Sequence, residues 1–338
     1  IDWYFPGNRA GGPIQSVLSL TGTLSADLHF KIVTSNSDLG SDLPYAGIEP
    51  NTWLRQEHAE IMYLDRFHQT YKFLKKIIDE TNFDVLYINS FFSFRFSILP
   101  LFIARQKRIK KRIVLAPRGM LGQGALNIKP FKKKLYLLVG NFSRFYSGLT
   151  WHATSENELH EITLKIPRAH NVQVVANIPR RLSPGKHAEK KKDHLNLFFL
   201  SRISKKKQLD YALNILKATV PGNIRFSIYG PVEDDTYWKS CEQLISQLPH
   251  NIHVRYLGVL KPGEIEHTLA DEHVMILPTM NENFGHSIVE SLYCGCPVII
   301  SDQTPWQDLR QSEAGFSIGL DKPEQFRQAL SYYLNMDE

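Results

Sequence analysis

Residues 273–279 (HVMILPT) and 282–290 (ENFGHSIVE) decide the fold, because they predict a strand, a short loop and the start of a helix. HVMILPT is a continuous apolar run with the length of a buried parallel strand. Glu282 lies in the loop, Gly285 near the helix N-terminus, and Glu290 about two turns into the helix. A helix N-terminus binds anions, whereas carboxylates on both sides of it suit sugar hydroxyls. The stretch therefore predicts a pocket for a nucleotide sugar.

Apolar runs of strand length alternate with helical patterns along the whole chain. In the second half, the strands are predicted at 195–201, 225–230, 253–258, 273–279, 297–302 and 316–320. In the first half, they are predicted at 29–35, 84–90, 112–117, 149–155 and 171–178. Ile1 also reads as part of a strand, so we expect a few residues before it. The pattern predicts an α/β protein with two doubly wound, Rossmann-like domains of parallel strands that face each other across a cleft.

Composition and cysteine usage describe the class of protein. The 338 residues, 43% hydrophobic and 22% charged, suffice for two ordered domains. Cys241, Cys294 and Cys296 form no CxxC pair, which is typical of a reducing cytoplasm, so we expect a cytoplasmic protein. The longest apolar run, 91–104, is interrupted by an Arg and a Pro and is too short to span a bilayer. We predict that it forms a buried helix.

Basic residues are concentrated in the first half of a chain whose net charge is +6. One cluster occupies 107–112 and another 129–134. Each is either a solvated face or a contact with an anionic partner such as a membrane surface. Within 128–146, Phe131, Leu135, Leu138 and Phe142 recur at helical spacing. This pattern indicates either a membrane-surface helix or a helix whose apolar side faces the core, and we favour the core.

Four motifs in a fixed order resemble the retaining glycosyltransferases of family 4, the glycosyl transferases group 1. They are the glycine loop Gly11-Gly12-Pro13, Asn177 of the inter-domain segment, the basic segment 201–210 and the E-x7-E element from Glu282 to Glu290. The resemblance is strongest from 195 to 310 and implies the GT-B fold. It implies an acceptor-binding domain over 1–180, onto which a terminal helix at 323–338 packs back, and a nucleotide-sugar-binding domain over 181–322. Segment 179–194, rich in Pro and Lys, is predicted to be an exposed linker.

Sugar transfer from a nucleotide requires that the departing diphosphate be stabilised by a metal or by cations. Asp234-Asp235 reads as a helix start rather than a metal site, so we expect neither a metal nor a cofactor. Arg202 and Lys207, at the basic positions of the family's segment, are the predicted diphosphate clamp. The alternative for this segment is a solvated loop, and Lys205 and Lys206 are expected to face solvent.

By resemblance, Glu282 faces the transferred sugar, and together with Arg202 and Lys207 it makes up the predicted catalytic set. Glu290 binds the ribose or is an exposed helix glutamate, while His286 contacts the diphosphate or caps the helix. The predicted donor-binding residues are Glu290, Asn283, Phe284, Gly285, His286, Gly11, Gly12, Gly230 and Val259. Gly11 and Gly12 are alternatively an ordinary turn. Many family members carry a His near 117–126, where this chain has none, so Arg118 is the candidate substitute; His152 is a second acceptor-side candidate or a structural residue.

These expectations describe a retaining, metal-independent transferase that moves a sugar from a UDP- or GDP-sugar to a saccharide or lipid-linked saccharide. Its expected setting is the assembly of surface polysaccharide or lipopolysaccharide at the inner membrane face. One alternative is a sugar-nucleotide epimerase of the same fold. Another is a basic nucleic-acid-binding protein, for which the sequence offers no RNP-like motif or zinc pattern. We therefore expect no nucleic-acid partner.

Overall fold

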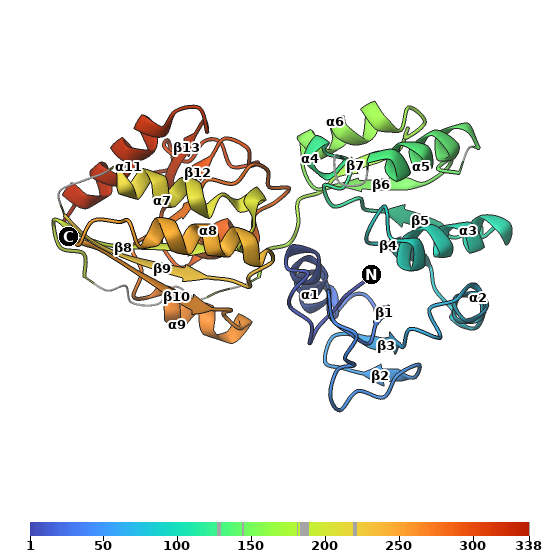
Figure 1. Ribbon diagram of the computed structural model, residues 1–338. Coiled ribbons are helices and arrows are strands. Elements are labelled where there is room, and N and C mark those ends of the chain that lie inside the picture. Colours follow the sequence, from blue (N-terminus) through green and yellow to red (C-terminus); the bar gives the residue numbers. More distant parts are fainter. Residues whose placement is uncertain (127–129, 144, 181, 183–188, 219–221, 338) are drawn as a thin grey trace. The chain divides into compact units, whose positions relative to one another are not determined.

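The structure is a computed structural model that describes residues 1–126, 130–143, 145–180, 182, 189–218 and 222–337. The chain forms two compact units, Ile1–Ile178 and Pro179–Glu338 (Figure 1). Part of the segment predicted as a linker, 183–188 with residue 181, lies outside the described residues. Within this segment, residues 189 and 191–194 are exposed, as predicted, whereas Lys190 is buried and donates a hydrogen bond to the Met336 carbonyl at 2.7 Å.

The C-terminal unit is built on one sheet in which all described strand pairs are parallel. Its strands are β8 (His194–Leu200), β9 (Asn223–Tyr229), β10 (Ile252–Gly258), β11 (Val274–Leu277), β12 (Val298–Ser301) and β13 (Gly315–Ile318). Their order is β10-β9-β8-β11-β12-β13. The chain moves outward from β8 to β10 and then returns to the other side of β8. The winding therefore reverses between β8 and β11, which is where ligands bind in such sheets.

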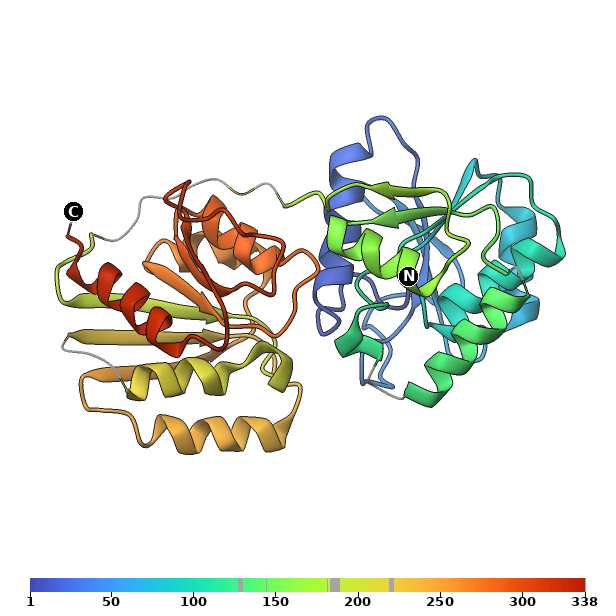
Figure 2. The ribbon, with the colours of Figure 1, turned by 90° about the horizontal axis from the view of Figure 1, so that it is seen from above.

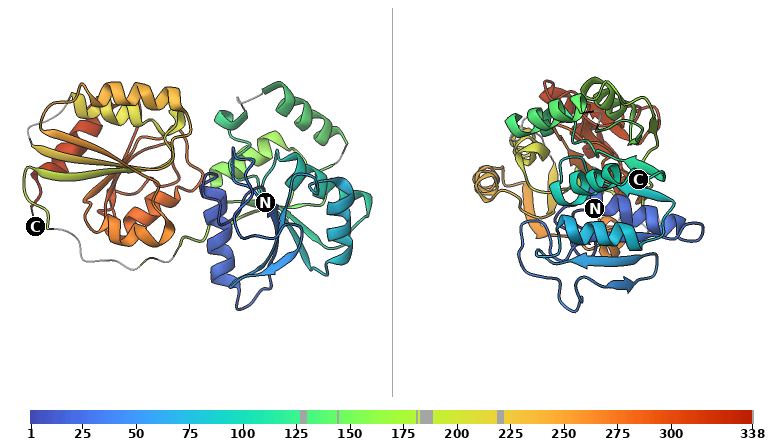
Figure 3. Two further views of the ribbon diagram at one scale, coloured as in Figure 1. Left: turned by 60° about the horizontal axis from the view of Figure 1, so that its bottom comes forward. Right: turned by 90° about the vertical axis from the view of Figure 1, so that its right-hand side faces the viewer.

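Helices cover both faces of this sheet, as its continuous apolar strands require. Figure 3 shows α7 (Leu209–Lys217), α8 (Asp235–Ile245) and α11 (Pro323–Asn335) on one face, with α9 (Ile265–Leu269) and α10 (His286–Tyr293) on the other. We expected the terminal helix to pack on the first domain. Phe326, Leu330 and Leu334 are buried in the core of the C-terminal unit, and α11 contacts α7. One side of α11 is therefore covered within its own unit, and its packing on the first domain stays a prediction.

The N-terminal unit contains two sheets, where the strand pattern predicted one parallel sheet. The larger consists of four parallel strands in chain order, β4 (Val85–Ile88), β5 (Arg112–Leu115), β6 (Thr150–Ala153) and β7 (Val172–Val174). The smaller pairs β1 (Lys31–Ser35) with β3 (Glu60–Leu64) in parallel, and β3 with β2 (Trp53–Arg55) antiparallel. The sequence analysis missed β2 and β3. Residues 1–4 form no strand, although the Asp2 carbonyl accepts a hydrogen bond from Ser35 N at 3.1 Å.

The helices of the N-terminal unit are α1 (Gly12–Leu24), α2 (Tyr71–Glu80), α3 (Leu99–Gln106), α4 (Gln123–Leu126), α5 (Pro130–Phe142) and α6 (Glu156–Lys165). A π-helical turn, Phe94–Ile98, leads into α3. The predicted helix in 91–104 is thus present, and Leu101 and Ile103 are buried as expected. Figures 1 and 2 show α3 and α5 side by side, and Arg105 of α3 donates to the Phe145 carbonyl beyond α5 at 3.0 Å. No described helix is long and apolar enough to cross a bilayer.

The orientation of α5 corrects our preferred interpretation of its sequence. Phe131, Leu135, Leu138 and Phe142 are all exposed, whereas we expected them to face the core. The inward side is occupied by Leu137 and Gly140 instead. A fully buried aromatic group of the four-stranded sheet, which includes Phe91, Tyr146 and Trp151, fills the space beneath. Lys129, part of the second basic cluster, lies outside the described residues.

Candidate functional site

Two segments meet at the switch point of the C-terminal sheet. Lys205–Lys207 form a short 3₁₀ turn beyond β8, and residues 278–285 connect β11 to α10. The Lys206 carbonyl accepts hydrogen bonds from Met280 N at 2.8 Å and from the Thr279 hydroxyl at 3.2 Å. Residues more than 70 positions apart are thereby fixed together at the carboxyl edge of the sheet.

Lys207 and Glu282 form a buried ion pair at this edge. The Lys207 ammonium donates to Glu282 Oε1, and both side chains are largely withdrawn from solvent. Glu282 is held from a third strand as well, because its N–H donates to the Gln303 carbonyl beyond β12 at 2.9 Å. The sequence analysis placed Lys207 at the diphosphate and Glu282 at the sugar. The structure brings these two side chains into direct contact.

Arg202 lies in the same charged group and is paired with a residue that the sequence analysis did not single out. Its Nη1 is 2.8 Å from Glu233 Oε1, beyond the end of β9. Glu233 follows the predicted strand 225–230 and Gly230, so its strand-end position was the available signal. Arg202, Lys206, Lys207, Glu233 and Glu282 form one group of three cations and two carboxylates, with a formal charge of +1 when all are ionised.

Lys206 is exposed, as we expected, but it also belongs to the charged group. Desolvation of its ammonium lowers its pKa. The nearby Lys207 and Arg202 lower the pKa further, while Glu282 and Glu233 raise it. Lys206 therefore belongs to the charged group, because its backbone is pinned to Thr279 and its ammonium lies among the other charges.

Helix α10 begins beside this group with Gly285 as its N-cap. Gly285 has φ 80° and ψ 64°, a left-handed conformation that glycine adopts at no steric cost. A Cβ at this position would lie 2.7 Å from Ile288 Cδ1. Phe284 is buried, and its carbonyl accepts a hydrogen bond from Trp306 Nε1 at 2.5 Å. The His286 ring packs edge-on against Phe284, at 4.9 Å between centroids.

Glu290 is half-buried rather than an exposed helix glutamate. Desolvation raises the pKa of its carboxyl to about 7, although the positive charge of Arg180 acts in the opposite direction. An isolated, partly desolvated carboxyl is suited to accept hydrogen bonds from hydroxyl groups. The role of Glu290 at the ribose stays a prediction.

Two further predicted donor-binding residues lie at the ends of β9 and β10. Gly230 has φ 137°, and a Cβ there would lie 1.9 Å from the Ser201 carbonyl oxygen, so the backbones approach closely. Gly230 N also donates to the Gly258 carbonyl at 2.7 Å. Val259, just beyond β10, is exposed. The carboxyl ends of β8, β9 and β10 are therefore tied together through backbone contacts.

In the N-terminal unit, Arg118 lies at the carboxyl edge of the four-stranded sheet with φ 56°. Its guanidinium donates to Asn89 Oδ1 at 2.6 Å, to the Tyr87 hydroxyl at 3.0 Å and to Asn177 Oδ1. All three partners are neutral. None of these partners neutralises the charge of Arg118 at this edge. Asn177, from the inter-domain segment, helps to position the guanidinium.

His152 is tied to the same network. Its Nδ1 lies 2.6 Å from the Tyr87 hydroxyl and its Nε2 lies 2.8 Å from the Val175 carbonyl. Burial lowers the pKa of His152, and the nearby Arg118 lowers it further, which favours the neutral imidazole. These contacts support the structural alternative for His152, while they leave Arg118 and His152 joined through Tyr87.

Glu158 holds the turn that contains Arg118. Its buried carboxylate accepts hydrogen bonds from Gly119 N at 2.6 Å and from the N–H and the hydroxyl of Thr154, both at 2.7 Å. Glu158 thus links the ends of β5 and β6. The glycine loop lies elsewhere in the unit, where Gly11 is the N-cap of α1, with φ 65°, and Gly12 is the first residue of the helix.

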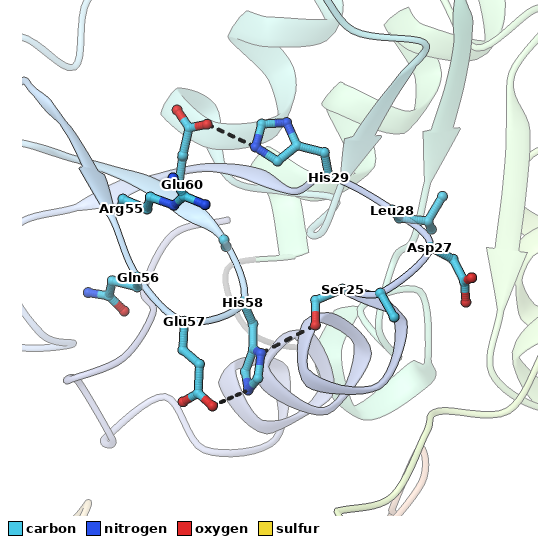
Figure 4. A pocket seen from close by; sticks show the side chains of 11 residues that line it. Ser25, Asp27, Leu28, His29, Arg55, Gln56, Glu57, His58 and Glu60 are labelled. Atoms are coloured by element: carbon cyan, nitrogen blue, oxygen red, sulfur yellow. Dashed lines mark hydrogen bonds and ion pairs between the residues drawn. The ribbon is translucent and has the colours of Figure 1, made fainter.

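A hollow in the N-terminal unit lies at the smaller sheet, near the N-terminal ends of β1 and β3 rather than their carboxyl ends (Figure 4). His29 Nε2 is 2.8 Å from Glu60 Oε1, and His58 lies 3.3 Å from the Ser25 hydroxyl and 3.7 Å from a carboxylate oxygen of Glu57. Ligands of such sheets bind at the carboxyl ends of the strands. We therefore assign no part of the active site to this hollow.

Sequence comparison identifies the class of the C-terminal unit. Residues 182–338 match the family described as glycosyl transferases group 1. The match spans nearly all of the unit that carries Arg202, Lys207, Glu282 and Glu290. The resemblance to this family that the sequence predicted is thus confirmed for the C-terminal unit.

Two relatives are similar to parts of the chain. An uncharacterized 41.2 kDa protein of the cps region of Klebsiella pneumoniae is 24% identical over 239 residues, covering 67% of this chain. The O-antigen chain mannosyltransferase B of Escherichia coli is 32% identical over 72 residues, or 21% of this chain. The aligned stretches span 62% and 18% of these relatives' own lengths, less than two thirds in each case.

The fold is also that of solved structures. HepE from Anabaena, determined in complex with UDP and glucose, aligns with a TM-score of 0.64 and 14% identity over 98% of this chain and 92% of its own. The protein therefore has the α/β GT-B fold, with two Rossmann-like domains based on parallel sheets, as the sequence predicted.

Proposed function

We propose that the protein transfers a sugar from a UDP- or GDP-linked donor to a saccharide or lipid-linked saccharide, with retention of configuration and without a metal or other cofactor. The observation that carries the proposal is the buried Lys207–Glu282 pair at the switch point of the C-terminal sheet. A cation and a carboxylate held side by side fit a substrate that joins a diphosphate to a polyhydroxyl sugar. The match of the C-terminal unit to the glycosyl transferases group 1 family supports this reading.

The charged group suits the departure of a diphosphate. As the glycosidic bond breaks, negative charge develops on the leaving phosphate, and preorganised cations stabilise that charge. Lys207 is the nearest donor to the sugar side because it contacts Glu282, and Arg202 is the planar fork for the phosphate oxygens. We assign the developing charge to these two residues, with the first turn of α10 as a further donor of N–H groups.

The remaining donor contacts follow from position. Glu282 accepts hydroxyls of the transferred sugar, and Glu290 accepts those of the ribose. Asn283, Phe284 and Gly285 present backbone amides to the sugar or the phosphates, with His286 beside them. Gly230 allows close approach of the backbone, and the exposed Val259 segment is assigned to the base. The leaving phosphate itself helps to deprotonate the acceptor hydroxyl in this proposal.

The acceptor is assigned to the N-terminal unit, whose Arg118 and His152 lie at the carboxyl edge of its larger sheet. Gly11 and Gly12 keep their predicted place among the donor-binding residues. One relative is an O-antigen mannosyltransferase and another comes from a cps region, which supports a role in surface polysaccharide or lipopolysaccharide synthesis. We further propose a cytoplasmic protein that contacts an anionic membrane through the basic clusters 107–112 and 129–134, with no nucleic-acid partner.

The first experiment identifies the donor. The purified protein is incubated with UDP, GDP and ADP in a thermal-shift assay, and then with UDP-glucose, UDP-galactose and GDP-mannose with or without a lipid extract of an encapsulated bacterium. We expect one nucleotide to raise the unfolding temperature and the matching sugar nucleotide to transfer its sugar with the anomeric configuration retained.

The Glu282→Gln variant is the matched test of the site, since it keeps the shape of the side chain. It should lose transfer while it still binds the nucleotide. An epimerised sugar formed from the donor alone would favour the epimerase. Full transfer by Glu282→Gln, or no stabilisation by any of the three nucleotides, would overturn the assignment.

A further inference from the structure

Helix α5 carries a row of exposed apolar side chains on one side. Phe131, Leu135, Leu138, Val139 and Phe142, here called the α5 stripe, are 78%, 50%, 68%, 56% and 88% exposed. They occupy positions i, i+4, i+7, i+8 and i+11, which lie on one side of an α-helix. A contiguous apolar surface of this kind marks an interaction site, whereas single exposed apolar residues do not.

The opposite side of α5 is fixed against its own unit. Gly140 lies so close to the Tyr146 ring that a Cβ would be 2.4 Å from Cε2 of that ring. Leu137 is buried in the same core, and Lys133 donates to the Ala125 carbonyl at 2.6 Å while it lies over the Phe92 ring. These contacts set the rotation of the helix about its axis. The α5 stripe therefore cannot turn inward without loss of this packing.

The charges around the α5 stripe are positive. Lys132 and Lys134 are exposed, and no carboxylate of the described residues lies within ion-pair distance of either. The sequence contains no Asp or Glu between Asp84 and Glu156, although this stretch holds 13 Lys and Arg residues. A protein partner of mixed charge gains little from such a surface. An anionic surface is electrostatically complementary to it.

An apolar stripe between lysines has the pattern of a helix that lies in the interface of a bilayer. With 13 residues, α5 is about 20 Å long and therefore too short to span the hydrocarbon core. Phe131 and Phe142, near its two ends, are aromatic side chains suited to the boundary between headgroups and acyl chains.

We propose that α5 lies flat in the headgroup region of an anionic bilayer, with the α5 stripe inserted and Lys132 and Lys134 on lipid phosphates. The helix follows the carboxyl edge of β5 in the chain, and Lys133 ties its first turn back to α4. The helix thus begins near the edge that carries Arg118. The docking itself does not depend on the function proposed above. Its consequence, that a lipid-linked acceptor is brought to the edge that carries Arg118, does rest on that function.

The test measures binding to vesicles and needs no substrate. Sedimentation is compared for vesicles of phosphatidylcholine alone and of phosphatidylglycerol and phosphatidylcholine in equal parts. We expect binding only to the anionic vesicles, and a loss of affinity of at least about tenfold in the Phe131→Ser/Phe142→Ser variant. Phe67→Ser is the matched control, because Phe67 is equally exposed but lies outside α5.

A second variant, Lys132→Glu/Lys134→Glu, should lose binding to anionic vesicles with its unfolding temperature unchanged. Unaltered vesicle binding by the serine variant would overturn the proposal. The proposal would also be overturned if light scattering showed that the wild type is a dimer and the serine variant a monomer. The partner of α5 would then be a second copy of this chain. Nucleotide stabilisation of the wild type is measured in parallel. A wild type that binds nucleotide but no anionic vesicles would contradict the docking and leave the proposed function intact.

Discussion

The two units arrange charge at the carboxyl edges of their sheets in different ways. In the C-terminal unit, Lys207 and Arg202 are each paired with a carboxylate from another strand. In the N-terminal unit, Arg118 is held by neutral acceptors, and the buried Glu158 binds backbone and hydroxyl donors. The first edge therefore carries ion pairs, and in the function proposed above a charged ligand exchanges with their partners. The second has a rigid framework that keeps one positive charge in place.

In the function proposed above, this difference separates residues that act on a substrate from residues that hold a loop. A pair such as Lys207 and Glu282 is costly to bury for stability alone, since desolvation offsets much of the attraction between the charges. Its position at a ligand-binding edge provides a reason for it. Glu158, by contrast, satisfies three donors at once, which explains its burial through structure alone.

The largest effect that tests this comparison is expected at Lys207. The Lys207→Met variant should lower the turnover number by about 100- to 1,000-fold, because it removes a cation aimed at the leaving diphosphate. Lys205→Met is the control, since Lys205 is exposed in the same 3₁₀ turn. Steady-state kinetics with the identified donor provide the measurement. If the turnover number of Lys207→Met stayed within threefold of wild type, the assignment of Lys207 to the active site would be wrong.

A large effect on stability is expected at Glu158. The Glu158→Ala variant should destabilise the N-terminal unit by about 3 kcal/mol, because three buried donors lose their acceptor. Hydrogen exchange should report the loss of protection in β5 and β6, with β8 and β9 unaffected. The control is Glu156→Ala, an exposed position in the first turn of the same helix. If both variants behave alike, the anchoring role of Glu158 is wrong.

A moderate effect is expected from the titration of Glu290. Its carboxyl has a pKa of about 7, raised from 4.5, so burial favours the protonated form and the stability it contributes is lost as pH rises from 4.5 through 7. Nucleotide binding should follow the opposite trend, because ribose hydroxyls donate to the ionised carboxylate. Affinity for the nucleotide should rise about tenfold between pH 6 and pH 8.

Calorimetric titration of the wild type and of Glu290→Gln measures this dependence. The variant lacks the titrating group, so its affinity should vary little over the same range. An equal pH dependence in both proteins would assign the effect to another group.

The smallest effect is expected at Glu233. This carboxylate is substantially exposed, so Glu233→Gln should change the free energy of unfolding by less than about 1 kcal/mol. The substitution frees Arg202 and makes the charged group more positive. Nucleotide affinity should therefore increase by about threefold, which is roughly the value of one exposed ion pair. Weaker binding in this variant would show that Glu233 contacts the ligand itself.

Local patterns in the sequence were sufficient for the strands of the C-terminal unit and for the start of α10. Continuous apolar runs predict buried parallel strands wherever they occur, and Gly285 marks the helix start through a conformation that other residues avoid. The hairpin of β2 and β3 was missed, because β2 has only three residues and β3 is defined by its pairing with β1, which is distant in the sequence. Glu233 was missed because its partner Arg202 lies 31 positions away.

The sequence by itself determined the family resemblance of the C-terminal half, the α/β architecture of both halves and the presence of charged residues at strand ends. These follow from motifs and periodicities that act over a few residues. Only the tertiary structure decided that Lys207 meets Glu282, that Glu290 is desolvated, and that α5 turns its apolar side outward. Those outcomes depend on which side chains already fill the interior, as Tyr146 and Trp151 do beneath α5. The periodicity of a helix defines its apolar side but not what covers that side.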